Sequence, residues 1–308
     1  MRNMVILCAC AMLTVASGFS QTDMVTIDSA SIPIMNKVNN DGPFREKVYR
    51  MHPKYQLPAA GAAIVLSSLG FKALDENARL SPTDALKLNP NDINAFDRPA
   101  ALRNPVNFAR DASRGDFFLN FSVASPVLLA LDKHVRKDWV DILTLYMAAQ
   151  AFDNVFYFAS IAAVRRPRPM AYNPGLDSIA RSGIGMTKSF FSGHVSFSST
   201  ATFFAVKVYT DYHNIKGWPR VFLYSIAAVP PLLTGYFRIQ SGRHFKTDVM
   251  VGMLVGSTSG ILVPELFRKK DGAPRSVMLS PYYVPDGGGV SMSLALNAGK
   301  KTARSFSF

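Results

Sequence analysis

The chain has 308 residues, of which 48% are apolar and 18% charged, with a net charge of +13 and a mean hydropathy of +0.11. This hydropathy is high for a soluble enzyme and low for a chain lying mostly in a membrane, which indicates several apolar helices joined by polar loops. The sequence has no zinc-finger, helix-turn-helix or RNA-binding signature, so its charge argues against nucleic acid and for phosphate groups and anionic lipids as partners.

Residues 1–20 have the pattern of a secretory signal peptide. Arg2 supplies the positive charge, residues 5–16 are apolar, and small residues follow. Both cysteines, Cys8 and Cys10, lie inside this segment. We therefore expect an exported mature chain without disulfide or thiolate chemistry.

Residues 21–114 are mostly polar and predict an N-terminal arm with short surface helices. The arm contains one apolar stretch, residues 57–71, whose length is marginal for crossing a bilayer. At the other end of the chain, residues 266–308 form a tail that begins with the basic cluster Arg268, Lys269 and Lys270. This tail is interpreted as either a short hairpin or a disordered segment.

Residues 115–265 hold the remaining apolar segments and predict an all-α, membrane-embedded helical bundle. The segments are residues 117–131, 140–164, 195–208, 221–236 and 249–263. The third is rich in small and hydroxyl side chains, which suits a helix buried in the bundle. The fourth contains two adjacent prolines and is expected to be kinked or broken. Three glycines at four-residue spacing in the fifth predict close packing against another helix.

Polar side chains inside or between these segments are mostly given structural roles. Asp153 lies in the middle of residues 140–164 and is expected to be a hydrogen-bond partner within the bundle. Lys188 is interpreted as an ordinary loop residue. His134 and His213 stand outside the polar clusters and are expected to be solvated.

Three polar clusters abut the ends of apolar segments and point to phosphoryl chemistry. Arginine binds phosphate oxygens bidentately, so Arg168 and Arg238 are candidate phosphate ligands. Ser192 and Gly193 precede a helix, where backbone N–H groups and a hydroxyl can bind an anion. Arg165 and Arg166 are possible accessory cations.

Two histidines supply the nucleophile and the acid that such a reaction needs without a metal. Asp248 follows His244 by four residues, which places both on one helix face. A carboxylate there can accept the proton of one ring nitrogen and leave the other free to attack. His244 is therefore the predicted nucleophile, Asp248 its orienting group and His194 the general acid.

These residues resemble the motifs of the type 2 phosphatidic acid phosphatase superfamily: Lys-x6-Arg-Pro, Pro-Ser-Gly-His and Ser-Arg-x5-His-x3-Asp. Arg168-Pro169 matches the end of the first motif, and Ser192-Gly193-His194 the second. Arg238, His244 and Asp248 match the third at the correct spacings. The resemblance implies a helical bundle, hydrolysis without metal or cofactor, a phosphohistidine intermediate and a lipid phosphate or diphosphate as substrate.

Three positions depart from the family pattern. Ile161 stands where the family has Lys, Phe191 replaces the Pro, and Phe237 replaces the Ser. The loss of the Lys removes one cation and motivates a second hypothesis, a catalytically inactive lipid-binding membrane protein. A vanadate-dependent haloperoxidase and a soluble acid phosphatase of the same superfamily are further alternatives.

Charge placement predicts how the bundle is oriented. Lys133, Arg136 and Lys137 separate the first two segments of the core, and Arg268–Lys270 follow the last. Placing these clusters in the cytoplasm turns the phosphatase motifs toward the periplasm. The expected location is a bacterial cell envelope, with membrane lipids as partners.

Overall fold

The computed structural model describes residues 47–269, 277–284 and 287–294. The expected signal peptide, residues 1–20, lies outside the described residues, as do the two cysteines and residues 21–46 of the expected arm. Residues 47–268 form one compact unit, and the strands belong to another unit, which is described by itself.

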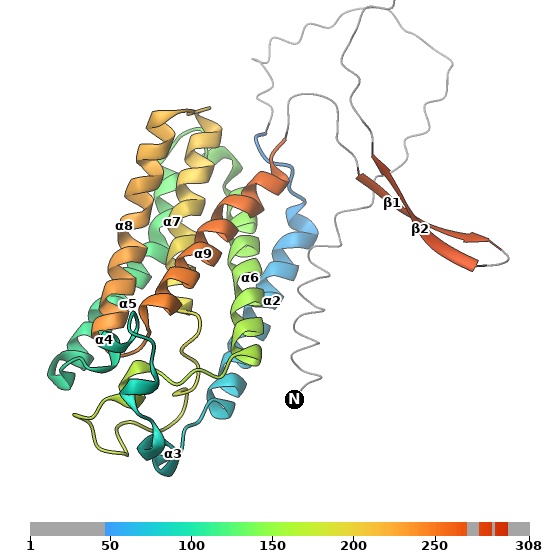
Figure 1. The fold of residues 1–308 in the computed structure, drawn as a ribbon. Coiled ribbons are helices and arrows are strands. Elements are labelled where there is room, and N and C mark those ends of the chain that lie inside the picture. The colour runs from blue at the N-terminus through green and yellow to red at the C-terminus, as the bar shows by residue number, and fades with distance from the viewer. Residues whose placement is uncertain (1–46, 270–276, 285–286, 295–308) are drawn as a thin grey trace, which may run out of the picture. The chain divides into compact units, whose positions relative to one another are not determined.

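The compact unit is built from long helices, which confirms the expected all-α bundle (Figure 1). The six long helices of the described residues are α2 (Pro53–Asn77), α5 (Phe108–Ala124), α6 (Trp139–Ala163), α7 (Gly193–Tyr212), α8 (Trp218–Gln240) and α9 (Lys246–Phe267). Two short helices, α3 (Pro82–Lys87) and α4 (Arg98–Ala101), lie between α2 and α5.

Short 3₁₀ turns connect these elements, at Pro90–Asp92, Pro105–Asn107, Ser125–Leu131, Arg136–Asp138 and Pro169–Tyr172. The segment expected at residues 117–131 is thus divided, because α5 ends at Ala124 and a 3₁₀ turn follows, with Pro126 as its second residue. A proline fits the first turn of a helix, where its missing N–H has no partner to lose.

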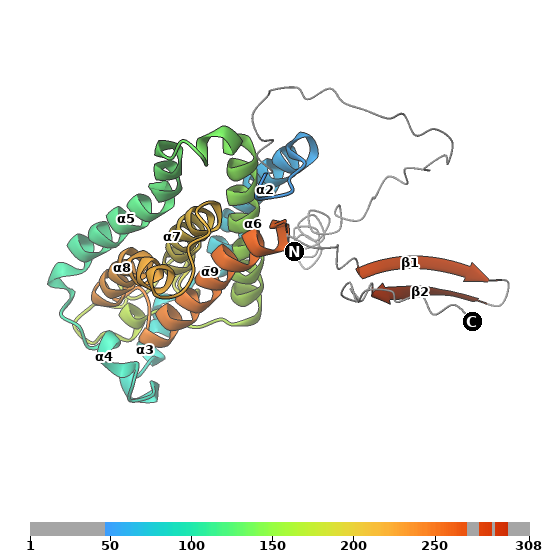
Figure 2. The same cartoon turned by 90° about the horizontal axis from the view of Figure 1, so that it is seen from above.

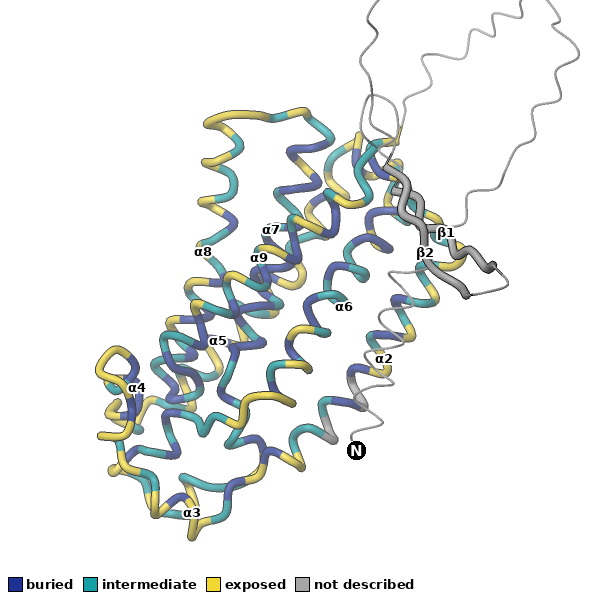
Figure 3. Tube along the Cα trace, turned by 45° about the vertical axis from the view of Figure 1, so that its right-hand side comes forward, coloured by how far each residue is buried: buried dark blue, intermediate teal, exposed yellow. Residues whose placement is uncertain are grey.

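Helix α7 is the central element of the bundle and packs against α5, α6, α8 and α9 (Figure 2). Its hydroxyl side chains are mostly buried, as the sequence predicts for residues 195–208. Figure 3 shows the contrast between α7, which is largely buried, and α8, which has exposed residues along its length. The core beside α7 includes Leu145, Phe204, Val208 and Val263.

The glycines of α9 allow it to lie directly against the backbone of α7. A Cβ atom on Gly252, Gly256 or Gly260 would lie 2.6, 2.1 or 2.5 Å from a backbone carbonyl oxygen of α7 or its N-cap. No side chain fits at such distances. The four-residue glycine spacing therefore allows the close contact between α9 and α7, as predicted for a glycine-bearing helix face.

The sequence predicts that this segment is kinked or broken at Pro230 and Pro231; helix α8 is continuous through both, so it is not broken. Each proline removes one hydrogen bond to the preceding turn, and the backbone bonds on both sides hold the helix together. The hydroxyl of Thr234 donates to the carbonyl of Pro230 at 3.0 Å and adds a contact at this point.

A buried charged network closes the end of the bundle where α7 finishes. The carboxylate of Asp211 accepts from the Tyr49 hydroxyl at 2.8 Å and forms ion pairs with Lys207, Arg220 and Arg268. In the first turn of α7, Ser196 donates to Asp153 of α6. Asp153 is thus a hydrogen-bond partner within the bundle, as expected.

Residues 277–294 contain an antiparallel hairpin of β1 (Val277–Val284) and β2 (Gly287–Leu294). Val284 pairs with Gly287, and residues 285–286 between them lie outside the described residues. Of the two interpretations of the tail, the structure therefore has the hairpin.

Candidate active site

The three sequence clusters meet at one end of the bundle, the lower end in Figure 1. Arg168 follows the end of α6, Ser192 and Gly193 begin α7, and Arg238 lies in the last turn of α8. His244 lies in the short connection between α8 and α9. Because these helix ends are neighbours in the bundle, residues far apart in the sequence share one site.

His244 is buried and held by the backbone of the segment that precedes α7. Its ring Nδ1 lies 2.8 Å from the carbonyl oxygen of Ser189. A carbonyl only accepts, so Nδ1 carries the proton and Nε2 keeps its lone pair. Burial and the charges of Arg168 and Arg238 hold the pKa of His244 well below its ordinary value. The ring is therefore neutral and oriented at neutral pH, with a lone pair available on Nε2.

Asp248 acts on His244 indirectly, in contrast to the direct hydrogen bond that the sequence spacing predicts. Its Oδ2 lies 4.0 Å from Nδ1 of His244, beyond hydrogen-bond distance. The same oxygen accepts from the Ser189 hydroxyl at 2.6 Å and from the backbone N–H of Phe245 at 2.8 Å. Asp248 thus positions Ser189, and the carbonyl of Ser189 positions His244.

His194, the predicted general acid, has a carboxylate neighbour that the sequence analysis missed. Its Nε2 lies 3.3 Å from Oδ1 of Asp116 in α5, and Arg238 donates to the same oxygen at 2.8 Å. Asp116 comes from a helix with none of the matching motifs. The one sequence signal is its place at the start of an apolar stretch, which it shares with the recognised clusters.

Three buried donors at the site have no hydrogen-bond partner within the described part of the chain: Nε of Arg168, Nε of Arg238 and the hydroxyl of Ser192. Buried polar atoms are nearly always paired, so a group of unpaired donors indicates a site for a ligand with acceptor oxygens. Burial and the neighbouring Arg243 lower the pKa of Arg168 to about 10. This concentration of positive charge favours an anion.

Gly193 is required by packing as well as by its place at a helix start. A Cβ atom here would lie 2.6 Å from the ring of Tyr157. Phe191 and Phe237, which replace the family's Pro and Ser, also make ring contacts. The ring centroid of Phe191 lies 5.8 Å from that of Tyr157, and the ring of Phe237 stacks on that of Phe118 with 5.7 Å between centroids. These two departures add aromatic packing around the site.

Arg166 forms ion pairs within the protein, whereas the sequence suggested that it is an accessory phosphate ligand. Its guanidinium pairs with Asp97 at 2.8 Å and with Asp248 at 2.5 Å, and it lies 4.1 Å over the ring of Phe245. A cation shared by two carboxylates has little charge left for a substrate. Arg165, the other accessory candidate, is exposed.

Ile161, which stands at the position of the family's lysine, is buried among aromatic rings. Two cations from other positions lie near the site. Arg243 and Lys188 are both close enough to His194 to interact with it electrostatically. Burial and Arg243 lower the pKa of Lys188, and its ammonium group forms an ion pair with Asp75 of α2. The sequence analysis gave neither residue a role, because neither stands at a motif position.

Comparison with protein families agrees with this geometry. Residues 139–271 match the family model described as the PAP2 superfamily. These residues are therefore similar to members of that superfamily. The match covers α6 to α9 and supports a phosphatase-type activity on phosphate esters. No curated protein and no solved structure matches the chain.

The two arginines of the Arg-Pro-Arg-Pro sequence are expected to respond oppositely to substitution. Arg166→Ala leaves the carboxylates of Asp97 and Asp248 uncompensated and should lower the free energy of unfolding by on the order of 3 kcal/mol. Arg168→Gln removes a buried cation that has no ion pair in the described residues and should leave stability unchanged or higher.

The measurement is thermal unfolding of the purified variants beside the wild type, together with binding of orthovanadate as a phosphate mimic. Arg168→Gln should lose vanadate binding at an unfolding temperature that is unchanged or higher. Equal destabilisation by the two substitutions would contradict the division of roles.

Proposed function

We propose that this PAP2 protein hydrolyses a lipid phosphate or diphosphate monoester through a phosphohistidine intermediate, without a metal ion in the reaction. The observation that carries the proposal is the group of unpaired donors beside His244. Arg168, Arg238 and Ser192 offer hydrogen bonds to phosphoryl oxygens, and the neutral imidazole offers a lone pair to phosphorus. Phosphoryl transfer needs this positioning and charge more than any other contribution.

In the first step, Nε2 of His244 attacks phosphorus as the bond to the lipid oxygen breaks. The proton that the lipid alcohol needs comes from His194, which must hold it on Nε2 near Asp116. In the second step, His194 takes a proton from water, and the resulting hydroxide displaces the phosphoryl group from His244. Inorganic phosphate leaves, and both histidines return to their starting states.

The lipid class of the substrate is supported by the outer surface of the bundle. Large apolar side chains on α8 and α9 face outward: Val221, Phe222, Ile226, Val229, Leu232, Tyr236, Met250, Leu254, Leu262 and Leu266. Both helices are long and apolar enough to cross a bilayer, and less than half of each apolar window is buried within the protein. Such a surface suits contact with acyl chains.

The proposed orientation places the active site on the periplasmic face of a bacterial membrane. The basic residues Lys133, Arg136, Lys137, Lys216 and Arg220 lie at the other ends of the same helices. Positive residues are retained on the cytoplasmic side, so the end that carries His194 and His244 faces outward.

Membrane insertion predicts resistance to extraction. The full-length protein should remain in the membrane pellet after washing with alkaline carbonate and enter solution only with detergent, because the exposed faces of α8 and α9 need acyl chains or detergent around them. Release by carbonate alone would favour a soluble acid phosphatase with the same site.

The catalytic proposal predicts phosphate release that depends on His244 and resists EDTA. Detergent-purified wild type and His244→Ala are compared on a panel of phosphatidic acid, phosphatidylglycerol phosphate, polyprenyl diphosphate and lipid A phosphate. The variant should lose at least about a thousandfold in rate, since the nucleophile is removed. An acid-labile phosphate label on the wild-type chain, compared with acid-stable phosphorylated controls, distinguishes phosphohistidine from other phosphoresidues.

His52→Ala is the matched control, because His52 is exposed and precedes α2, away from the site. It should keep the full rate. Folded wild-type protein that releases phosphate from no lipid would favour the inactive lipid-binding hypothesis, and halide oxidation on adding vanadate would favour a haloperoxidase.

We also propose that Lys188 and Arg243 replace the cation missing at Ile161. The Lys188 side chain is mostly buried and shares its charge with Asp75, and Arg243 is near Arg168, His194 and Lys188. A bound phosphoryl group competes with Asp75 for the ammonium group. The positive charge thus reaches the site from the loops before α7 and α9, whereas in the family motif it comes from the end of the helix corresponding to α6.

Removing these cations should weaken phosphoryl binding. Lys188→Ala and Arg243→Ala should each lower kcat/KM by roughly ten- to a hundredfold, about the effect of losing one charged hydrogen bond. The control is Lys87→Ala, which removes an exposed lysine that also pairs with an aspartate. Unchanged kcat/KM in both site variants would show that the enzyme works without a substitute for the family lysine.

A further inference from the structure

A second cluster of chemically active side chains lies at the end of the bundle opposite the proposed active site. It consists of Asp132 and His134, between α5 and α6, and His213, directly after α7. The 20 residues of α7 separate it from the His194 end by about 30 Å, at about 1.5 Å per residue. The PAP2 reaction therefore has no use for these three residues.

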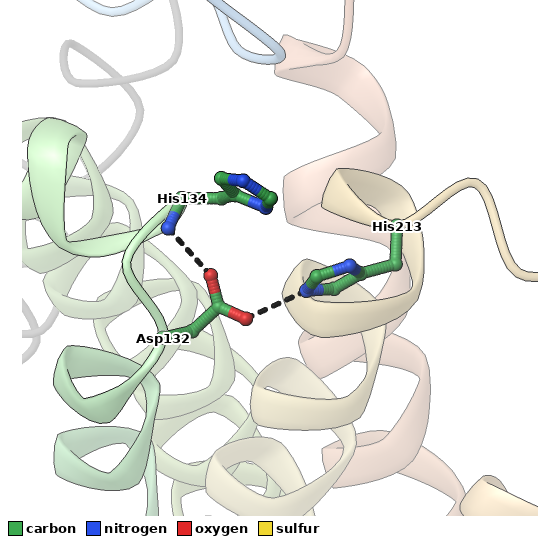
Figure 4. A group of neighbouring side chains, drawn as sticks. All are labelled: Asp132, His134 and His213. Carbon is green, nitrogen blue, oxygen red and sulfur yellow. Dashed lines mark hydrogen bonds and ion pairs between the residues drawn. The ribbon is translucent and has the colours of Figure 1, made fainter.

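Asp132 is held in place by its own loop. Its Oδ1 accepts from the backbone N–H of His134 at 2.7 Å and from that of Val135 at 3.1 Å. This leaves Oδ2 directed toward α7, where it lies 2.7 Å from Nε2 of His213 (Figure 4). The carboxylate is thus oriented before any ligand binds, as carboxylate ligands of metal ions commonly are.

The imidazole of His134 completes the group. Its ring centroid is 5.6 Å from that of His213, and Figure 4 shows both rings beside the Asp132 carboxylate. One ligand atom from each of the three residues lies within 4.8 Å of the others. Asp132 and His213 are partly buried and His134 is exposed, so an ion could enter from solvent.

We propose that Asp132, His134 and His213 bind a divalent transition metal ion of the Zn²⁺ class. Two imidazole nitrogens and one carboxylate oxygen are ligands that such ions prefer, whereas Mg²⁺ and Ca²⁺ prefer oxygen alone. Bonds of about 2.0–2.2 Å to a tetrahedral ion place ligand atoms roughly 3.3–3.6 Å apart. Side-chain rotations that move the ligand atoms by about 1 Å bring them to that spacing, and water takes the fourth position.

A bound ion would link two segments between helices that are far apart in the sequence. Asp132 and His213 are separated by 81 positions, and the ion links the turn before α6 to the end of α7. Because the ion binds the folded protein and not the separated ligands, it raises thermal stability. Its distance from His244 means that it has no direct part in phosphate release, so this proposal stands independently of the proposed function.

The test uses tag-free, full-length protein in detergent, stripped with EDTA and dialysed. Zn²⁺ binding is measured by calorimetry and by the shift in unfolding temperature, with Mg²⁺ as the comparison ion. We expect Zn²⁺ to bind with about one ion per chain and to raise the unfolding temperature, and Mg²⁺ to do neither. EDTA should reverse the shift and leave the initial phosphatase rate at low temperature unchanged.

His134→Ala, His213→Ala and the matched control His52→Ala locate the ion. Loss of either ligand should weaken Zn²⁺ binding by roughly tenfold or more, and His52→Ala should bind as the wild type does. His134 is exposed, so its variant should fold even where His213→Ala loses the contact with Asp132. Equal Zn²⁺ binding in all variants, or no binding by the wild type, would overturn the proposal and leave an ion pair between Asp132 and His213.

Discussion

The buried carboxylate of Asp248 is the contact on which the geometry of the site depends. It accepts hydrogen bonds from the Ser189 hydroxyl, the Phe245 N–H and the Arg166 guanidinium, and so joins the start of α9 to two other loops. The backbone oxygen of Asp248 also accepts from the N–H of Ser192. A buried carboxylate tolerates no loss of these donors, since each leaves part of its charge unsatisfied. The position of His244 follows from this network through the carbonyl of Ser189.

The two arginines after α6 differ in whether their charge is satisfied within the protein. Arg166 is neutralised by Asp97 and Asp248, and Thr247 donates to Asp97 through its hydroxyl and its backbone N–H. Hydrogen bonds to Asp97 outweigh its burial and keep its pKa below the ordinary value. Arg168, two residues later, is left with an unpaired buried Nε. An unsatisfied cation costs stability in the free enzyme, and the proposed phosphoryl group offsets that cost when it binds.

Helix α7 connects both ends of the molecule through a polar interior. Its small and hydroxyl side chains let α9 approach its backbone, and they provide partners for Asp153 and for the carbonyl of Gly256. Ser192 and His194 lie at one end of this helix, and the Asp211 network and His213 lie at the other. The outward faces of α8 and α9 are apolar instead, so the polar side chains concentrate inside the bundle and at its ends.

The sequence by itself determined most of the long helices, a close helix contact at the glycines of α9 and the residues grouped at the site, because apolar length, glycine spacing and motif order are local properties of the chain. It also predicted a break in α8 that does not form, since propensity around Pro230 is weaker than the packing of the whole helix. Only the tertiary structure decided that Ser189 holds His244, that Arg166 is an internal counterion, and that Asp116, Lys188 and Arg243 come near the site. These contacts join residues from different elements, and no sequence spacing encodes a distance between side chains that only folding brings together.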